Sequence, residues 1–286
     1  MLQKFNRSWM LTGQCWRVLK ADPALFVFPL LSVTAVLLII ASLAWPVFAL
    51  HHRLHPIDDP GSTTHSARLL YYFLLGVFYL FTYVVTIFFN CALIAVALRR
   101  LDGEEATVGE GLQAALNNIG SILGYALIAA TVGWLLRWLE DRVGFIGRIV
   151  ISIIGAAWTM ASSMTLPVLV VENAGPVEAL TRSFELMKEN WGENLIGNSG
   201  IGLAIVMGAL PFFLIAYLPL SAAIASHKTD HIILAGLLMG ALVLGVVLIR
   251  TTLHAIYTAA LYRFATGAKE NAGIDADLLS DAFAPK

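Results

Sequence analysis

Six long apolar stretches, each long enough to cross a lipid bilayer as a helix, dominate this chain of 286 residues. A helix rises about 1.5 Å per residue, so about 20 residues span the roughly 30 Å hydrocarbon core. None of the stretches alternates between apolar and polar residues as a barrel strand does, and a helix satisfies its backbone groups internally. The sequence therefore predicts an all-α, polytopic membrane helical bundle. Its six spans are residues 25–50, 69–98, 119–139, 146–171, 195–224 and 232–264.

The composition agrees with a protein whose main solvent is lipid. Residues AVILMFWYC make up 58% of the chain and charged residues 13%, whereas soluble domains carry about 25% charged residues. The net charge of −1 gives no broad positive field, so no nucleic-acid partner is expected. Cys15 and Cys91 offer neither a disulfide framework nor a CxxC metal motif. The first apolar run is too long for a signal peptide, so we expect it to remain in the mature chain.

The distribution of lysine and arginine predicts the side of the membrane on which each loop lies, because cytoplasmic loops are enriched in both residues. Basic residues concentrate in the N-terminal segment, in the loops after the second and fourth spans, and in the C-terminal tail. These residues are Lys4, Arg7, Arg17, Lys20, Arg99, Arg100, Arg182, Lys188, Arg263, Lys269 and Lys286. The opposite loops carry fewer, so both termini are expected in the cytoplasm.

The segment between the fourth and fifth spans, Gly175–Leu195, is charged and yet amphipathic. Read as a helix, it places large apolar residues at steps of three and four. They are Val177, Leu180, Phe184, Met187, Trp191 and Leu195. This pattern predicts a helix that lies in the cytoplasmic interface with its apolar stripe toward the acyl chains. The alternative, a solvated helical loop, leaves six large apolar side chains in water.

The N-terminal segment repeats this pattern. Its stripe consists of Phe5, Trp9, Thr12, Trp16 and Leu19, with basic residues around it. Arg7-Ser8-Trp9 followed by Trp16 superposes on Arg182-Ser183-Phe184 followed by Trp191. The residues expected to anchor the interfacial helices are Arg7, Trp9, Trp16, Arg182, Phe184 and Trp191.

A third, weaker copy of the amphipathic segment, Thr107–Gly124, leads into the third span. The chain then divides into repeats of one interfacial helix and two spans, as internal duplication produces in other membrane proteins. The predicted repeats are 3–100, 104–173 and 175–266. They form a single membrane domain, residues 1–266, and residues 267–286 form a cytoplasmic tail.

Two sequence segments carry a resemblance to a known family. The first is "RSW…PLLS" near the start, and the second is "PVLVVENAGPVEALTRSFELMKENWG" in the middle. With six spans, they resemble a bacterial family of uncharacterised six-helix integral membrane proteins. That family is similar to the membrane domain of glycerophosphodiester phosphodiesterases, and Glu172–Gly192 is the most specific part of the match. The resemblance implies a bacterial inner-membrane location. It implies no phosphodiesterase activity, since that chemistry belongs to a separate soluble domain.

Polar residues of the spans are expected near one boundary of the membrane. Arg250 follows Ile232 by 18 residues, which is about 27 Å along a helix and close to the thickness of the hydrocarbon core. The same arithmetic predicts an inner-leaflet polar collar. Its members are Asn90, Glu172, Asn173, Arg250 and His254. A substrate-binding pocket near Arg250 is the alternative. No charged or histidine residue is expected at mid-depth, which argues against a proton relay.

The external loop after the first span contains the weak metal candidates of the chain. His51, His52, His55 and His65 lie there together with two aspartates. Imidazole and carboxylate groups can bind zinc, but their spacing matches no defined site. We therefore expect a solvated loop, with no metal and no cofactor.

The sequence contains no arrangement typical of an enzyme. Paired carboxylates, a Ser-His-Asp or Cys-His pair and an HExxH motif are not found on a common face, so the protein is expected not to be an enzyme. The preferred function is a structural or lipid-associated inner-membrane protein, as a component of a larger complex or alone. The alternative is a transporter or channel for a neutral or amphipathic solute. Expected partners are membrane lipids, with a second copy or other membrane proteins as further candidates, and Gly236–Gly240 forms a GxxxG motif for helix packing.

Overall fold

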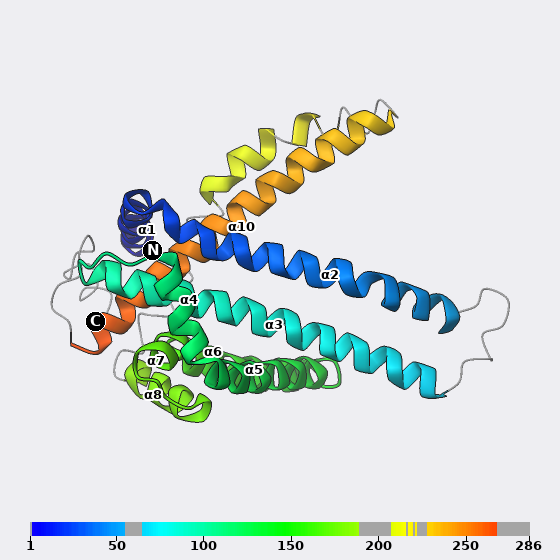
Figure 1. Ribbon diagram of the computed structural model, residues 1–286, viewed down its shortest axis with the longest axis horizontal. Coiled ribbons are helices and arrows are strands. Elements are labelled where there is room, and N and C mark those ends of the chain that lie inside the picture. The colour runs from blue at the N-terminus through cyan, green and yellow to red at the C-terminus, as the bar shows by residue number, and fades with distance from the viewer. Residues whose placement is uncertain are drawn as a thin grey trace. The chain divides into compact units, whose positions relative to one another are not determined.

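The computed structural model describes residues 2–54, 65–188, 207–215, 217–219, 221 and 228–267 (Figure 1). Every regular element within these ranges is a helix, as the sequence predicts. The α-helices are α1 (Leu2–Ala21), α2 (Val27–Leu54), α3 (His65–Leu101), α4 (Val108–Asn117), α5 (Ile119–Glu140), α6 (Phe145–Ser162), α7 (Thr165–Val171), α8 (Pro176–Lys188) and α10 (Thr229–Ala265). The short 3-10 helix η1 (Pro23–Phe26) joins α1 to α2.

Five helical segments are long and apolar enough to cross a membrane, so the chain is a multi-pass membrane protein. They are Pro23–Ser42, Tyr72–Leu101, Ile119–Glu140, Ile146–Val171 and Thr229–Ala265. Five of the six predicted spans are thereby found. The other, 195–224, lies largely outside the described residues, which retain a shorter apolar helix there, Met207–Pro219. Six spans and the cytoplasmic placement of the interfacial helices stay predictions.

The chain forms two compact units. One, here named the α1–α10 unit, consists of Met1–Pro29, Val96–Val108 and Phe184–Lys286. The other, named the α5–α7 unit, consists of Leu30–Ala95 and Gly109–Ser183. The long helices α2 and α3 each run from one unit into the other. The unit boundaries therefore fall inside continuous helices and not in loops.

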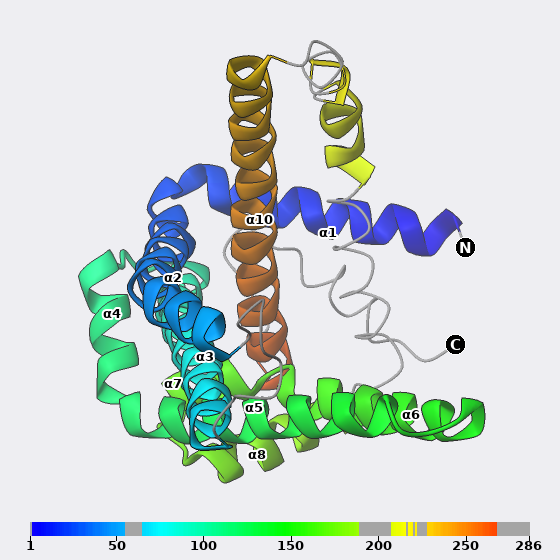
Figure 2. The ribbon, with the colours of Figure 1, turned by 90° about the vertical axis from the view of Figure 1, so that its right-hand side faces the viewer.

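In the α1–α10 unit, α1 lies across α10 (Figure 2). Cys15 and Leu19, one helical turn apart on α1, are buried, and α1 packs against α10. The chain turns after α1 at Asp22, whose side chain caps η1 by accepting a hydrogen bond from the Ala24 N–H at 3.1 Å. Pro23 at the next position has no N–H to satisfy. This cap fixes the point at which the chain leaves α1 and enters α2.

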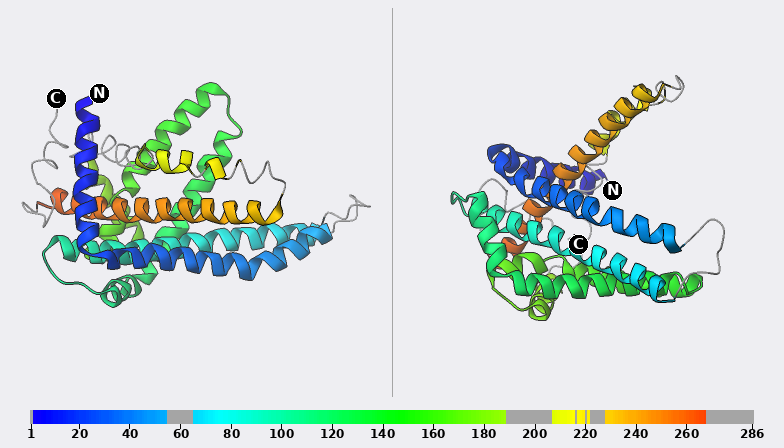
Figure 3. Two further views of the ribbon diagram at one scale, coloured as in Figure 1. Left: turned by 90° about the horizontal axis from the view of Figure 1, so that it is seen from above. Right: turned by 45° about the vertical axis from the view of Figure 1, so that its right-hand side comes forward.

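In the α5–α7 unit, α5 and α6 form a helical hairpin (Figure 3). The buried side chains of α5 repeat at helical spacing and most are small, which lets neighbouring helices approach closely. They are Ile122, Tyr125, Ala126, Ala129 and Ala130. The predicted fourth span breaks between α6 and α7, where the Met164 N–H donates a hydrogen bond to Ser183 Oγ at 3.0 Å. The serine thus satisfies a backbone donor that the helix break leaves free.

Each of the three longest helices divides into an exposed stretch and a buried end. On α10, the large apolar side chains from Ile232 to Val247 are mostly exposed, whereas residues 252–262 are buried except for His254. On α3, the exposed large residues precede position 82 and residues 91–98 are all buried. At the start of α2, Phe28 is buried, as is Leu25 in the preceding η1, and exposure begins at Leu30. A helix of 37 residues such as α10 is about 55 Å long and exceeds the roughly 30 Å hydrocarbon core, so part of it has to lie outside.

Gly124 of α5 lies where a side chain would collide with another element. An added Cβ would approach Pro176 Cγ to 2.8 Å. Overpacking against a rigid proline ring costs about 1–3 kcal/mol, and the gain in helix propensity from glycine to alanine is about 1 kcal/mol. We therefore expect Gly124→Ala to lower the thermal unfolding midpoint of the full chain in detergent. In the control Gly133→Ala, where nothing lies within 4 Å, the midpoint should stay or rise, and equal behaviour of the two variants would contradict the close contact.

Candidate functional site

The described side chains of α1, at residues 10 and 12–21, include some that pack on protein and some that are exposed. Gln14, Cys15 and Leu19 are buried. Trp16 and Lys20 lie on the exposed side, with the Lys20 ammonium 5.7 Å from the centre of the indole ring. The predicted stripe placed Trp16 and Leu19 together against lipid, and this is wrong for Leu19. Helical periodicity identifies an apolar face, but it does not indicate that protein covers Leu19 and leaves Trp16 exposed.

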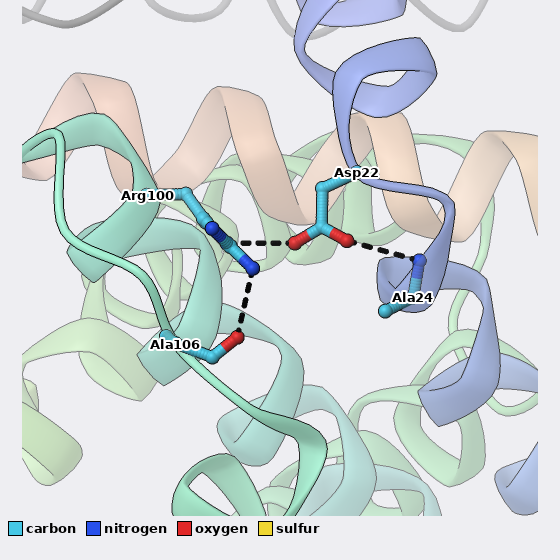
Figure 4. A network of polar contacts seen from close by, with 4 residues as sticks. All are labelled: Asp22, Ala24, Arg100 and Ala106. Carbon is cyan, nitrogen blue, oxygen red and sulfur yellow. Dashed lines mark hydrogen bonds and ion pairs between the residues drawn. The ribbon is translucent and has the colours of Figure 1, made fainter.

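The end of α1 is tied to the end of α3 by a short ion pair (Figure 4). Arg100 Nε lies 2.7 Å from Asp22 Oδ2, and Arg100 Nη2 donates a hydrogen bond to the Ala106 carbonyl at 3.0 Å. The other carboxylate oxygen, Oδ1, accepts the η1 cap from Ala24. The planar guanidinium thus pairs with the carboxylate through Nε and donates a hydrogen bond to the carbonyl through Nη2. One arginine therefore joins the α1–η1 junction, α3 and the loop after α3.

A second ion pair continues from α3 to α10. Helix α3 ends in a Schellman motif, in which Gly103 adopts φ 80° and the Glu104 N–H donates to the Arg99 carbonyl at 3.0 Å. This turn leaves Asp102 beside α10, where Arg263 Nη2 lies 2.7 Å from Asp102 Oδ1. Arg99 and Glu104 form a third, more exposed pair at 3.4 Å. We name Asp22, Arg100, Asp102 and Arg263 the ion-pair cluster.

Sequence reasoning missed the ion-pair cluster. Arg99, Arg100 and Arg263 were read only as charges that set the membrane orientation. The available signal was the acidic residues beside them, since Asp102 and Glu104 directly follow α3 and Asp22 directly precedes the first span. Acids next to basic residues at the ends of spans indicate ion pairs as well as topology.

Helix α8 differs in part from its predicted role. Val177 and Phe184 of the predicted stripe are exposed, at 64% and 46%, as a lipid-facing stripe requires, but Met187 is 3% exposed and belongs to the protein core. Ala179 and Ser183 are fully buried on the neighbouring face. The predicted placement of Met187 toward the acyl chains is therefore wrong, because the buried face of α8 extends around the helix to include it.

The residues of the predicted polar collar lie on α3, in the segment between α7 and α8, and on α10. Glu172 follows α7 and pairs with Arg182 of α8 at 3.5 Å. Asn173 follows it with φ 49°, a left-handed conformation that asparagine tolerates better than most residues. Asn90 is half-buried on α3. Arg250 and His254 are exposed one turn apart on α10, where His254 Nδ1 lies 3.5 Å from the Thr258 hydroxyl. That these groups share one depth stays a prediction.

Several predicted site residues cannot be described at side-chain level. Arg7 and Trp9 lie in α1, His51 and His52 in the last turn of α2, and His65 at the start of α3, but only their backbone is described. Trp191 and His55 lie outside the described residues. Among the residues that are described, no group of three histidine, cysteine or acidic side chains is arranged to hold a metal ion.

These contacts hold the described helix ends of the α1–α10 unit together and leave a cationic surface exposed on α1. The two carboxylates of the ion-pair cluster are engaged by arginines, so they hold helix ends together. The outward face of α1 presents an indole, an ammonium and the exposed Arg17. Such groups bind the phosphates and carbonyls of lipid headgroups, and indoles prefer the boundary between water and hydrocarbon.

The Asp22–Arg100 pair should contribute measurably to stability, because its side chains are only 15% and 30% exposed. In a double-mutant cycle of Asp22→Asn and Arg100→Gln, we expect a coupling free energy of roughly 1–3 kcal/mol. The matched control is Arg99→Gln with Glu104→Gln, a pair that is 47% and 60% exposed and should couple by at most about 1 kcal/mol. Both cycles are read from thermal or denaturant unfolding of the full chain. Equal coupling energies would show that the cluster does not clamp the helices.

The Cys15 thiol offers a direct measure of the docking of α1. Burial raises the pKa of Cys15 to about 12, so the reactive thiolate is scarce at pH 8. We expect slow alkylation of Cys15 in the folded protein and an ordinary thiol rate after denaturation, followed by peptide mapping. The variant Asp22→Asn should accelerate alkylation at Cys15 and leave Cys91, which is also buried, protected. Rapid alkylation of Cys15 in the folded wild type would contradict the packing of α1.

A comparison with protein families matches residues 69–272 to a family described as a family of unknown function (DUF6159). The match covers more than half of the chain, which therefore belongs to this family. The matched region includes α3 from residue 69 onward, α4 to α8 and α10, and with them Arg100, Asp102 and Arg263 of the ion-pair cluster. A comparison with curated proteins found no match.

Proposed function

We propose that this member of a family of unknown function is a non-enzymatic, lipid-associated structural protein of the bacterial inner membrane. Helix α1 would be its contact with the anionic cytoplasmic leaflet. The observation that carries the proposal is the arrangement of α1, which is anchored by its buried face and presents Trp16, Arg17 and Lys20 outward.

The physical basis of the proposal is the match between this face and a headgroup layer. An interfacial helix inserts aromatic and apolar side chains at the boundary and directs lysine and arginine to anionic lipid. Each basic residue near an anionic surface contributes about 1 kcal/mol. A free amphipathic peptide loses conformational freedom when it binds, whereas α1 is already fixed by Cys15, Leu19 and the Asp22–Arg100 pair. Binding of the fixed helix therefore costs less entropy.

The orientation follows from the distribution of basic residues. The N-terminal segment, the end of α3 and the end of α10 are rich in lysine and arginine, which supports a cytoplasmic location for these regions and for both termini. The resemblance to a bacterial six-helix membrane family supports the inner membrane. In this arrangement α8, with Val177 and Phe184 exposed, is a second interfacial helix on the same side.

The far end of the α5–α6 hairpin supports a spanning orientation for these helices. Trp134 and Trp138 stack with their ring centres 6.3 Å apart, and the Arg142 guanidinium lies 4.1 Å from the centre of the Trp138 ring. Tryptophan is enriched at both membrane–water boundaries, so these two rings support a boundary position for this end of α5. The hairpin would then place its turn at the opposite headgroup layer.

A non-enzymatic role agrees with the chemistry of the charged groups. A general base needs a carboxylate free to accept a proton near neutral pH. Asp22, Asp102 and Glu172 are each paired with an arginine, so each already makes a structural contact. The described charges thus serve better as structural contacts than as catalysts.

The proposal predicts that anionic lipid stabilises the protein through α1. We expect phosphatidylglycerol, added to the purified full chain in neutral detergent, to raise the thermal unfolding midpoint more than phosphatidylcholine does. Replacing two charges with Arg17→Gln and Lys20→Gln removes about 2 kcal/mol, or roughly 30-fold in the affinity for phosphatidylglycerol. The difference between the lipids should shrink in high salt, because salt screens exposed charges.

The control for this experiment is Arg148→Gln, which removes an exposed charge from α6 and leaves α1 unchanged. It should leave the response to phosphatidylglycerol at the wild-type level. If the α1 variant responds to phosphatidylglycerol as strongly as the wild type does, α1 is not the lipid contact and the proposed function is wrong.

A further inference from the structure

Helix α10 carries an exposed stripe whose chemistry changes from apolar to cationic along its length. The residues of this stripe follow one another at steps of four and three, so they lie on one face of the helix. The stripe consists of Gly236, Gly240, Val243, Val247, Arg250 and His254, all of which are exposed. Side chains added at Gly236 or Gly240 would meet nothing within 4 Å. The face is therefore open along its apolar part and ends in two nitrogen-bearing side chains.

Arg250 is positioned as a headgroup contact and not as a structural ion pair. No carboxylate among the described residues lies within ion-pair distance of it, in contrast to Arg100, Arg182 and Arg263. Arg250 follows Asp230 by 20 residues, which is about 30 Å and matches the hydrocarbon thickness. It is also the last exposed residue before the buried end of α10 begins. The helix thus brings an uncompensated cation to the level at which lipid phosphates lie.

We propose that this stripe binds one phospholipid, with the phosphate on Arg250 and His254 and an acyl chain along the glycine–valine part. From Gly236 to Val247 the helix advances about 17 Å, close to the roughly 15 Å thickness of one leaflet. The guanidinium can donate two parallel hydrogen bonds to a phosphate. His254 Nδ1 faces the Thr258 hydroxyl at 3.5 Å, which leaves Nε2 for a phosphate oxygen. The site is separate from α1. The proposed function concerns contact of α1 with the membrane surface, whereas this site holds one particular phospholipid.

A second copy of the chain fits the same stripe less well. Copies of a membrane protein share one orientation, so a symmetric dimer through Gly236 and Gly240 would run α10 parallel to itself. The two Arg250 side chains would then meet near the membrane boundary, where like charges repel strongly because screening is weak. A phospholipid supplies the opposite charge at this position and an apolar chain beside the glycines.

The experiment counts the lipids that stay bound to the full-length protein. We expect native mass spectrometry of the wild type in mild detergent to show one tightly held phospholipid per chain, and Arg250→Gln to lose it or to weaken its binding at least tenfold. Gly240→Phe fills the apolar part and should lose the lipid while the charge remains. Arg250→Lys should retain part of the binding, since the charge stays and the bidentate geometry is lost.

Controls separate this site from α1 and from folding defects. The variant with Arg17→Gln and Lys20→Gln should keep the tightly held lipid, so failure of one proposal leaves the other standing. Only variants whose unfolding midpoint without added lipid equals that of the wild type are compared. Retention of the lipid by both Arg250→Gln and Gly240→Phe overturns the inference.

Two other occupants give distinct results. Inorganic phosphate is added at millimolar concentration as a probe for a soluble phosphate ligand. If it stabilises the wild type through Arg250 while no lipid is retained, the ligand is a soluble phosphate and the inference is wrong. If the wild type is a dimer that Gly240→Phe converts to a monomer with its lipid unchanged, the stripe is a self-association surface and the inference is wrong as well.

Discussion

The length of the helices relative to the membrane is the constraint on which the structure depends. Helices α3 and α10 have 37 residues each and would extend about 55 Å, whereas hydrocarbon accounts for about 30 Å. The remaining turns lie outside the hydrocarbon. The burial of their side chains shows that other parts of the protein pack against them. Along α10, exposure ends at His254, and the following turns are buried under α1 and η1. The N-terminal segment thus packs on the part of α10 that extends beyond the hydrocarbon.

The ion-pair cluster follows from the same constraint. Helix ends outside the hydrocarbon carry the charges that the spans exclude, and in the α1–α10 unit these ends meet. Arg100 engages Asp22, and Arg263 engages Asp102, each at 2.7 Å. The cost of partly burying these charges is offset by opposite charge and by hydrogen bonds such as that from Arg100 to Ala106. Because Asp22 also caps η1, the contact that fixes the end of α1 sets the start of α2.

The sequence predicted the membrane helices well and their partners poorly. The apolar runs identify α3, α5 and α10 because a span is a property of one continuous segment. The burial of Leu19 and Met187 was missed, since periodicity places them on an apolar face without indicating whether lipid or protein covers it. The pairing of Asp22 with Arg100 depends on the approach of distant helix ends, which no local pattern encodes. Ser183 was recognised in a motif, but its contact with Met164 required knowledge of the break between α6 and α7.

Two groups of described basic residues differ in what they contact, and this difference connects structure to function. One group lies within 4 Å of carboxylates of the same chain and consists of Arg99, Arg100, Arg182 and Arg263. These arginines form ion pairs within the protein. Arg17 and Lys20 on α1 and Arg250 on α10 are exposed next to apolar or aromatic groups. Exposed cations beside Trp16 and Val247 are the groups to which anionic lipid would add opposite charge, and the proposed lipid contacts rest on them.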